Sequence, residues 1–136
     1  LCGIDIKLIL KIYVPAAAGH DLIEDARLTW NEVKTILGKE VADIIFCCTD
    51  CRGKTREDRH SKEFFDTLIE NDIAVFVKLC DTIANVKMGL LMNSSMIKRY
   101  KNEYSHLKSL LYVKDATSLN ANRNIVIDRL GILLSL

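Results

Sequence analysis

The chain has 136 residues, the usual length of one domain with one hydrophobic core. Apolar residues make up 49% and the net charge is +1, which is ordinary for a globular protein and excludes a broad basic field for nucleic acid. No apolar run is long enough to span a membrane, and no signal-type segment opens the sequence. We therefore expect a cytoplasmic protein with no membrane partner, whose five cysteines are reduced thiols.

Apolar spacing predicts helices along the whole chain. In the first half we expect an apolar helix from Ile4 to Gly19 that is disturbed at Pro15 and continues through His20–Asp25. A second helix should begin at a Thr29–Glu32 capping box and end at Gly38. Two more helices are expected, one at Val41–Cys48 and one that carries Phe64 and Leu68. In the second half we expect a buried central helix at Ile73–Leu91 after an Asn71–Asp72 cap, one from Ser94 or Ser95 to about Tyr112, and one within 120–134. The predicted fold is all-α, with six or seven helices in a single domain over residues 1–136.

A histidine and three carboxylates crowd the segment His20-Asp21-Leu22-Ile23-Glu24-Asp25. On a helix, residues four apart share a face, so His20 would lie beside Glu24 and Asp21 beside Asp25. A neutral imidazole and a carboxylate are good ligands for a divalent transition metal, and neighbouring carboxylates can orient and deprotonate a water there. The alternative is a solvated acidic helix end.

A further carboxylate, Asp81, lies in the middle of the apolar helix expected at Ile73–Leu91. A carboxylate inside a buried helix is costly unless it is paired or bound to a metal. Asn85 lies one turn further on and faces the same way. The alternative is an internal aspartate that caps a neighbouring helix or pairs with a lysine.

These two motifs, in this order and separation, resemble the HD hydrolase domain of RelA/SpoT homologues and their small stand-alone relatives. The resemblance runs from about Ile4 to about Leu91 and includes the Thr49-Asp50 pair and the basic stretch after it. It implies an all-α HD-domain bundle that binds one manganese ion. It also implies a small phosphorylated nucleotide as partner, because this family removes pyrophosphate from the 3′ position of ppGpp and pppGpp.

Site residues follow from the resemblance, position by position. His20, Asp21 and Asp81 would bind Mn²⁺, and Glu24 and Asp25 would position and activate the attacking water. Asn85 would hold the nucleotide or order the site.

Three departures from the family pattern bear on the metal and the substrate. The family has a further metal-ligand histidine upstream, and residues 1–19 contain none, so we expect that ligand and its helix to precede Leu1, or the ligand to be replaced or lost. Thr82 and Lys87 stand where arginine is usual. The alternatives are therefore an HD-type phosphohydrolase acting on another nucleotide and an inactive HD module that senses nucleotide.

Three further features of the sequence bear on phosphate binding, zinc binding and oligomer contacts. Arg52, Lys54, Arg56, Arg59 and His60 crowd one expected loop, which is either a phosphate clamp or a solvated loop. The cysteines around Cys47 lack the spacing of a structural zinc site. The C-terminal Ile132-Leu133-Leu134 is expected to be core rather than an oligomer contact, and the oligomeric state is left open.

Overall fold

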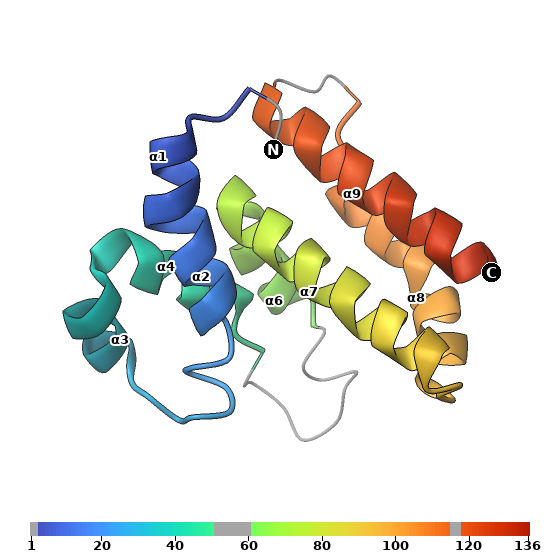
Figure 1. The fold of residues 1–136 in the computed structure, drawn as a ribbon, viewed down its shortest axis with the longest axis horizontal. Helices are drawn as coiled ribbons and strands as arrows, with labels where there is room; N and C mark the ends of the chain where they lie inside the picture. Colours follow the sequence, from blue (N-terminus) through green and yellow to red (C-terminus); the bar gives the residue numbers. More distant parts are fainter. Residues whose placement is uncertain (1–2, 51–60, 115–117) are drawn as a thin grey trace. The chain divides into compact units, whose positions relative to one another are not determined.

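The computed structural model describes residues 3–50, 61–114 and 118–136, which form helices and turns with no strand (Figure 1). The predicted all-α class is therefore confirmed. The first helices, α1 (Ile6–Leu8), η1 (Ile9–Tyr13) and α2 (Val14–Gly19), run on as one helical stretch, and counted in this way the described chain has seven helices. The others are α3 (Trp30–Leu37), α4 (Lys39–Cys48), α6 (Lys62–Ile69), α7 (Asp72–Leu91), α8 (Met96–Leu111) and α9 (Ser118–Ser135). None of the described helices is both long and apolar enough to cross a membrane.

The described residues form two compact units. One contains residues 4–77, and the other contains residues 78–136 with the first residues of the chain. The boundary lies between Val77 and Lys78, inside α7, so that this one helix contributes residues to both units. The single domain over residues 1–136 stays a prediction.

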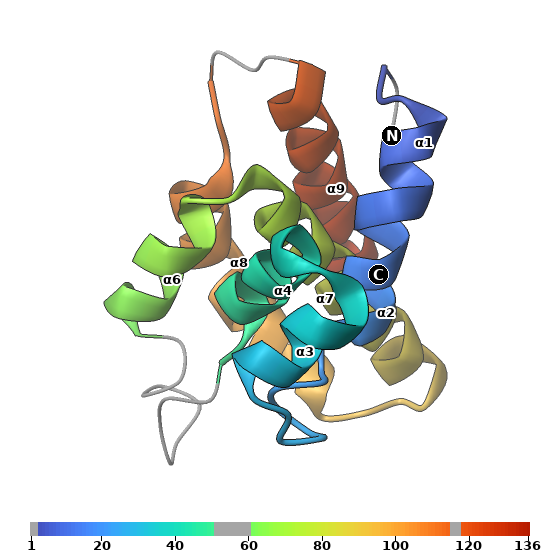
Figure 2. The same ribbon diagram turned by 90° about the vertical axis from the view of Figure 1, so that its left-hand side faces the viewer.

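In the unit of residues 4–77, α4 is the central helix and packs on η1, α2, α3 and α6 (Figure 2). Its buried side chains, Val41, Ile44, Ile45 and Cys48, recur at helical spacing on one face. The Cys48 thiol also donates to the Ala74 carbonyl in α7 at 3.3 Å, which attaches the start of α7 to this core.

Local sequence signals place the helix ends of this unit. Thr29 and Glu32 form the expected capping box on α3, and Gly38 ends that helix at φ +85°, a conformation that favours glycine. The Asn71 side chain accepts from the backbone of Ile73 and Ala74 and so caps α7. These three predicted helix ends are therefore confirmed.

The expected disturbance near Pro15 is a wide turn of helix at Ile9–Tyr13. Here Val14 N–H donates to the Ile9 carbonyl, five residues back. A proline ring inside a helix clashes with the carbonyl four residues before it. A π-type turn just before Pro15 widens the helix at that carbonyl and lets the helical run continue to Gly19.

In the unit of residues 78–136, α8 and α9 pack together around a core of Val86, Leu130 and Leu134. The expectation that the C-terminal apolar segment is core is confirmed for Leu134. The Tyr104 ring lies over Gly131, and its hydroxyl donates to the Ile127 carbonyl at 3.2 Å. Because Gly131 has no side chain, the aromatic ring of α8 can approach the α9 backbone this closely.

Replacing Gly131 by alanine is expected to destabilise this unit. An added Cβ would lie 2.8 Å from Tyr104 Cζ and closer still to its hydroxyl, so the ring would have to move and release Ile127. Overpacking of this kind costs about 1–3 kcal/mol, which urea unfolding would measure. Gly131→Ala should cost less in a Tyr104→Phe background, where the nearest atom is gone; an equal cost in both backgrounds would show that the ring is not the obstacle.

Candidate metal and nucleotide site

The segment His20–Asp25 is a hydrogen-bonded turn, not the continuation of α2 that we expected from the sequence. The helix ends at Gly19, where Leu22 N–H donates to the Gly19 carbonyl at 3.0 Å. Asp25 N–H then donates to the Asp21 carbonyl at 2.8 Å. The predicted continuation of the helix through His20–Asp25 is therefore wrong, although a backbone hydrogen bond still joins Asp25 to Asp21.

Side chains pack closely around Gly19, where α2 ends. A Cβ on Gly19 would lie 3.0 Å from Ile45 Cδ1, 3.1 Å from Leu22 Cδ1 and 3.2 Å from Leu37 Cδ1. The missing side chain lets α2 approach α4 and lets Leu22 fold back over the helix end. His20 is thus the first residue beyond a tightly packed helix terminus.

The His20 ring has both nitrogens engaged. Nδ1 lies 2.7 Å from the Ala17 carbonyl oxygen, which can only accept, so Nδ1 carries a proton. In the neutral ring the lone pair is then on Nε2, which lies 3.1 Å from Asp21 Oδ2. An imidazole held through Nδ1–H by a backbone carbonyl, with Nε2 left as a ligand, is the usual arrangement of a metal-binding histidine.

The spacing of this pair suits a divalent ion. Two ligand atoms about 2.1 Å from one ion and at right angles to each other are about 3 Å apart. His20 Nε2 and Asp21 Oδ2 match that separation, so the pair can supply two neighbouring ligands, although the same contact is an ion pair when the ring is protonated. Within the described part of either unit, no group of three or more His, Cys, Asp or Glu side chains is gathered to hold a metal.

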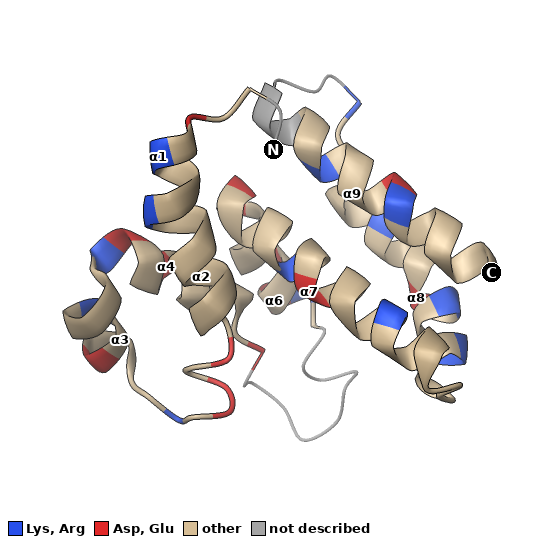
Figure 3. Ribbon diagram, viewed as in Figure 1, with Lys and Arg blue, Asp and Glu red and all other residues tan. Residues whose placement is uncertain are grey.

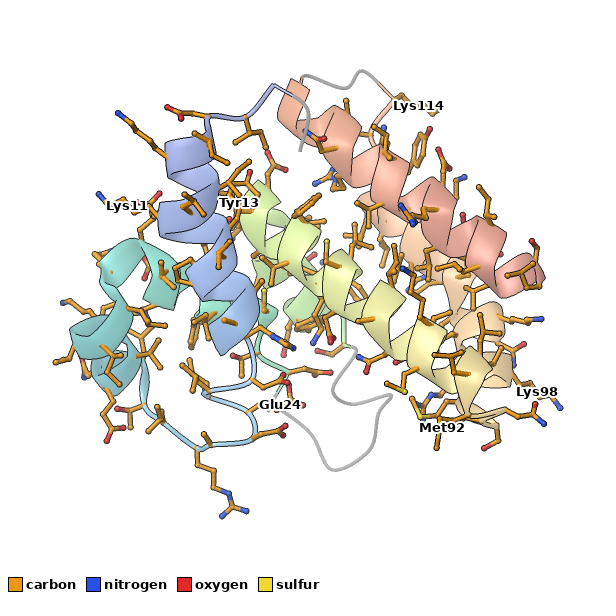
Figure 4. The ribbon with its side chains drawn as sticks, viewed as in Figure 1. Lys11, Tyr13, Glu24, Met92, Lys98 and Lys114 are labelled. Atoms are coloured by element: carbon orange, nitrogen blue, oxygen red, sulfur yellow. The ribbon has the colours of Figure 1, made fainter. Side chains whose placement is uncertain are left out.

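Two more carboxylates follow in the same turn. Glu24 is half-buried and Asp25 is exposed, and with Asp21 they place three negative charges directly after α2 (Figures 3 and 4). Such a concentration of like charge attracts a cation. A carboxylate that is still partly open to solvent can also exchange a proton with a nearby water.

Asp81 and Asn85 meet on α7 as the sequence predicted. Asn85 Nδ2 donates to Asp81 Oδ1 at 2.9 Å, one turn apart. Asp81 is half-buried and Asn85 is exposed, so the expectation that α7 is buried all round is wrong for this stretch. The amide therefore orients a carboxylate on a partly open helix face.

The predicted site residues fall into two groups. His20, Asp21, Glu24 and Asp25 share one turn in the unit of residues 4–77, and Asp81 and Asn85 share one helix face in the unit of residues 78–136. A single site that unites the two groups stays a prediction. The predicted basic loop, with Arg52, Lys54, Arg56, Arg59 and His60, lies outside the described residues.

Two features of the unit of residues 4–77 were not assigned a role from the sequence. The Ala17 carbonyl orients His20, and the three-residue spacing back from a histidine at a helix end could have indicated it. Asp50, which entered only as part of the resemblance, is buried together with Thr49, whose hydroxyl donates to the Ile45 carbonyl. A buried carboxylate after a helix is a costly feature that composition alone does not reveal.

Among the described cysteines, Cys48 is buried, and Cys47 and Cys80 are partly buried. Burial raises the pKa of the Cys80 thiol, and burial is also the main cause that raises the pKa of Cys47. A raised pKa keeps these two thiols protonated and unreactive at neutral pH. Cys2 and Cys51 lie outside the described residues.

Comparison of the chain with protein-family models, with curated proteins and with solved structures found no match.

The His20 ring is expected to carry its proton on Nδ1 when neutral, because the Ala17 carbonyl can only accept. Nitrogen-detected imidazole NMR distinguishes the two tautomers. Asp21→Asn should leave this tautomer in place, because it alters only the Nε2 side of the ring. A neutral ring protonated on Nε2 would contradict the geometry on which the ligand assignment depends.

Proposed function

We propose that this chain is a metal-dependent phosphohydrolase of the HD type, and that its substrate is ppGpp, from which it removes the 3′ pyrophosphate. The observation that carries the proposal is the His20 ring, held through Nδ1 on Ala17 with Nε2 beside the Asp21 carboxylate. That arrangement places two possible ligand atoms 3.1 Å apart. Asp81, oriented by Asn85, is the proposed third ligand.

The residues present fit one divalent ion of the manganese class. Imidazole nitrogen with carboxylate oxygen is a donor set that Mn²⁺ accepts, and no thiolate is required. His20, Asp21 and Asp81 would hold the ion. When bound, it supplies a Lewis acid that lowers the pKa of water and offsets charge on the phosphoryl group.

The carboxylates of the turn would carry the proton chemistry. Glu24 is the proposed general base, because it is half-buried and lies in the same turn as His20 and Asp21. It takes a proton from the attacking water as the new P–O bond forms. The bond between phosphorus and the 3′ oxygen breaks, pyrophosphate leaves, and the 3′ oxygen receives a proton. Asp25, whose backbone N–H donates a hydrogen bond to the Asp21 carbonyl, would orient the water.

Among phosphorylated nucleotides, ppGpp is the proposed substrate. It is supported by the order and spacing of the His20–Asp25 and Asp81–Asn85 motifs and by the cations at 52–60. A substrate with two pyrophosphate groups needs more cationic partners than a monophosphate does. Thr82 and Lys87, where the family pattern has arginine, are the places at which a different nucleotide would be accommodated.

Turnover of a nucleotide panel by the full-length protein with Mn²⁺ tests this function. We expect pyrophosphate release from ppGpp and pppGpp, and not from dNTPs or nucleoside monophosphates. Glu24→Gln should lower the rate by roughly a hundredfold or more, the usual scale for loss of a general base, while metal binding persists. Glu40→Gln, an exposed acid on α4, is the matched control and should keep the wild-type rate.

Other results of this experiment would favour a different substrate, a different function or a different base. Hydrolysis of another nucleotide but not ppGpp would retain the HD phosphohydrolase and reject the substrate. Metal binding with no turnover of any nucleotide would favour a sensing module. A Glu24→Gln protein with near-wild-type rate would reject Glu24 as the base.

A further inference from the structure

All three methionines of the chain lie between residues 88 and 96, where α7 ends and α8 begins. Met88, Leu91 and Met92 are three and four residues apart, so they share one face at the end of α7, and Met96 opens α8. We call these four residues the methionine patch. Leu91 is 81% exposed and Met92 is 72% exposed. Single exposed apolar residues are ordinary on a protein surface, whereas a group of them marks an interaction surface.

The backbone under the methionine patch is held in a defined shape. Asn93, at φ +49°, follows α7 in the left-handed conformation. Ser94 N–H donates to the Gly89 carbonyl at 2.8 Å and Asn93 N–H to the Leu90 carbonyl at 3.3 Å, the two bonds of a Schellman motif. The apolar side chains therefore project from a hydrogen-bonded helix end, whose backbone does not have to be ordered on binding.

Positive charge without any acid accompanies the methionine patch. From residue 82 to residue 102 the sequence has four Lys and Arg and no Asp or Glu. Figure 4 shows one of these cations, Lys98, at the same end of α7 and α8 as Met92. None of the four takes part in the ion pairs of the described residues, in contrast to Lys108, which is paired with Asp128. All four are exposed and available to an external anion: Lys87, Lys98, Arg99 and Lys101.

We propose that the methionine patch docks on the surface of an anionic lipid membrane. Leu91 and Met92 would enter the boundary between headgroups and acyl chains. The four cations would contact lipid phosphates, because the long side chains of Lys and Arg reach a polar layer while their stems stay on apolar surface. Apolar insertion and attraction to anionic lipid act together in this mode of binding.

A lipid surface fits the methionine patch better than a protein surface does. Leu91 and Met92 project into solvent, and a fluid bilayer accepts a projecting apolar group without a matching cavity. A protein partner would need a surface shaped to these side chains and a rim of carboxylates placed against the cations. The cations around the patch instead share one sign over 21 residues, which matches the uniform negative potential of an anionic leaflet.

Such a contact needs no spanning helix. The expectation of no membrane partner was drawn from apolar runs, which detect segments that cross a bilayer and not contacts with its surface. The nearest acid along α7, Asp81, lies seven residues before Met88, about 10 Å along the helix axis. That separation exceeds the Debye length of about 8 Å at physiological salt, so the Asp81 charge is largely screened from lipid headgroups at the patch.

Co-sedimentation of the chain with lipid vesicles tests the proposal. We expect binding to phosphatidylcholine vesicles that contain about 30% phosphatidylglycerol, and little binding to phosphatidylcholine alone. Binding should weaken as salt rises from about 50 to about 500 mM, because exposed charges are screened. Leu91→Gln with Met92→Gln should weaken it roughly tenfold or more, and so should Lys98→Gln with Arg99→Gln.

Matched substitutions on the first helical stretch serve as controls. Ile6→Gln with Leu10→Gln removes two apolar side chains that are each 63% exposed. Lys7→Gln with Lys11→Gln removes two exposed cations. Both proteins should bind the anionic vesicles as the wild type does, and circular dichroism checks the fold of every variant.

Quenching by lipids with brominated acyl chains locates the contact. The indole of a Met92→Trp protein should be quenched on binding, whereas that of an Ile36→Trp protein, at an exposed position of α3, should not. Failure to bind the anionic vesicles would overturn the proposal, including the case in which the chain binds poly(A) RNA or another protein instead. Binding that is lost in the control variants and kept in the methionine-patch variants would also overturn it.

Discussion

The last residue of α2, Gly19, has no side chain, and this lets the end of the helix pack closely against α4. That position lies against Ile45, Leu22 and Leu37 at distances that leave almost no room for a Cβ. The packing fixes where α2 ends, and the end of α2 fixes the Ala17 carbonyl within reach of the His20 ring. A ligand geometry at the surface therefore depends on an interior contact between α2 and α4.

The proposed chemistry needs more than this turn. His20 and Asp21 supply two adjacent ligands, and two ligands hold a divalent ion weakly unless further donors complete the set. The proposal assigns the next donor to Asp81, whose carboxylate is already oriented by Asn85. Both donor groups are thus prepared locally, each by a hydrogen bond within its own element, before any ion binds.

Much of the fold was predictable because its signals are local. The Thr29 capping box, Gly38 and Asn71 each act within a few residues, and the structure has all three where the sequence placed them. The end of α2 at Gly19 was not predictable from apolar spacing, because Gly19 packs against side chains that are distant in the sequence, such as Ile45. The partial exposure of Asp81 was missed for a similar reason: an apolar composition does not say how much of a helix its neighbours cover.

Paramagnetic broadening by Mn²⁺ tests most directly whether one ion joins the two motifs. Mn²⁺ added to isotope-labelled full-length protein broadens the amide signals of residues near it. The account predicts that signals from residues 20–25 and from residues 81–85 are lost together along one titration, and that Asp81→Ala weakens the broadening of both. Broadening confined to residues 20–25, unchanged in Asp81→Ala, would contradict the central claim that Asp81 shares a metal with His20 and Asp21.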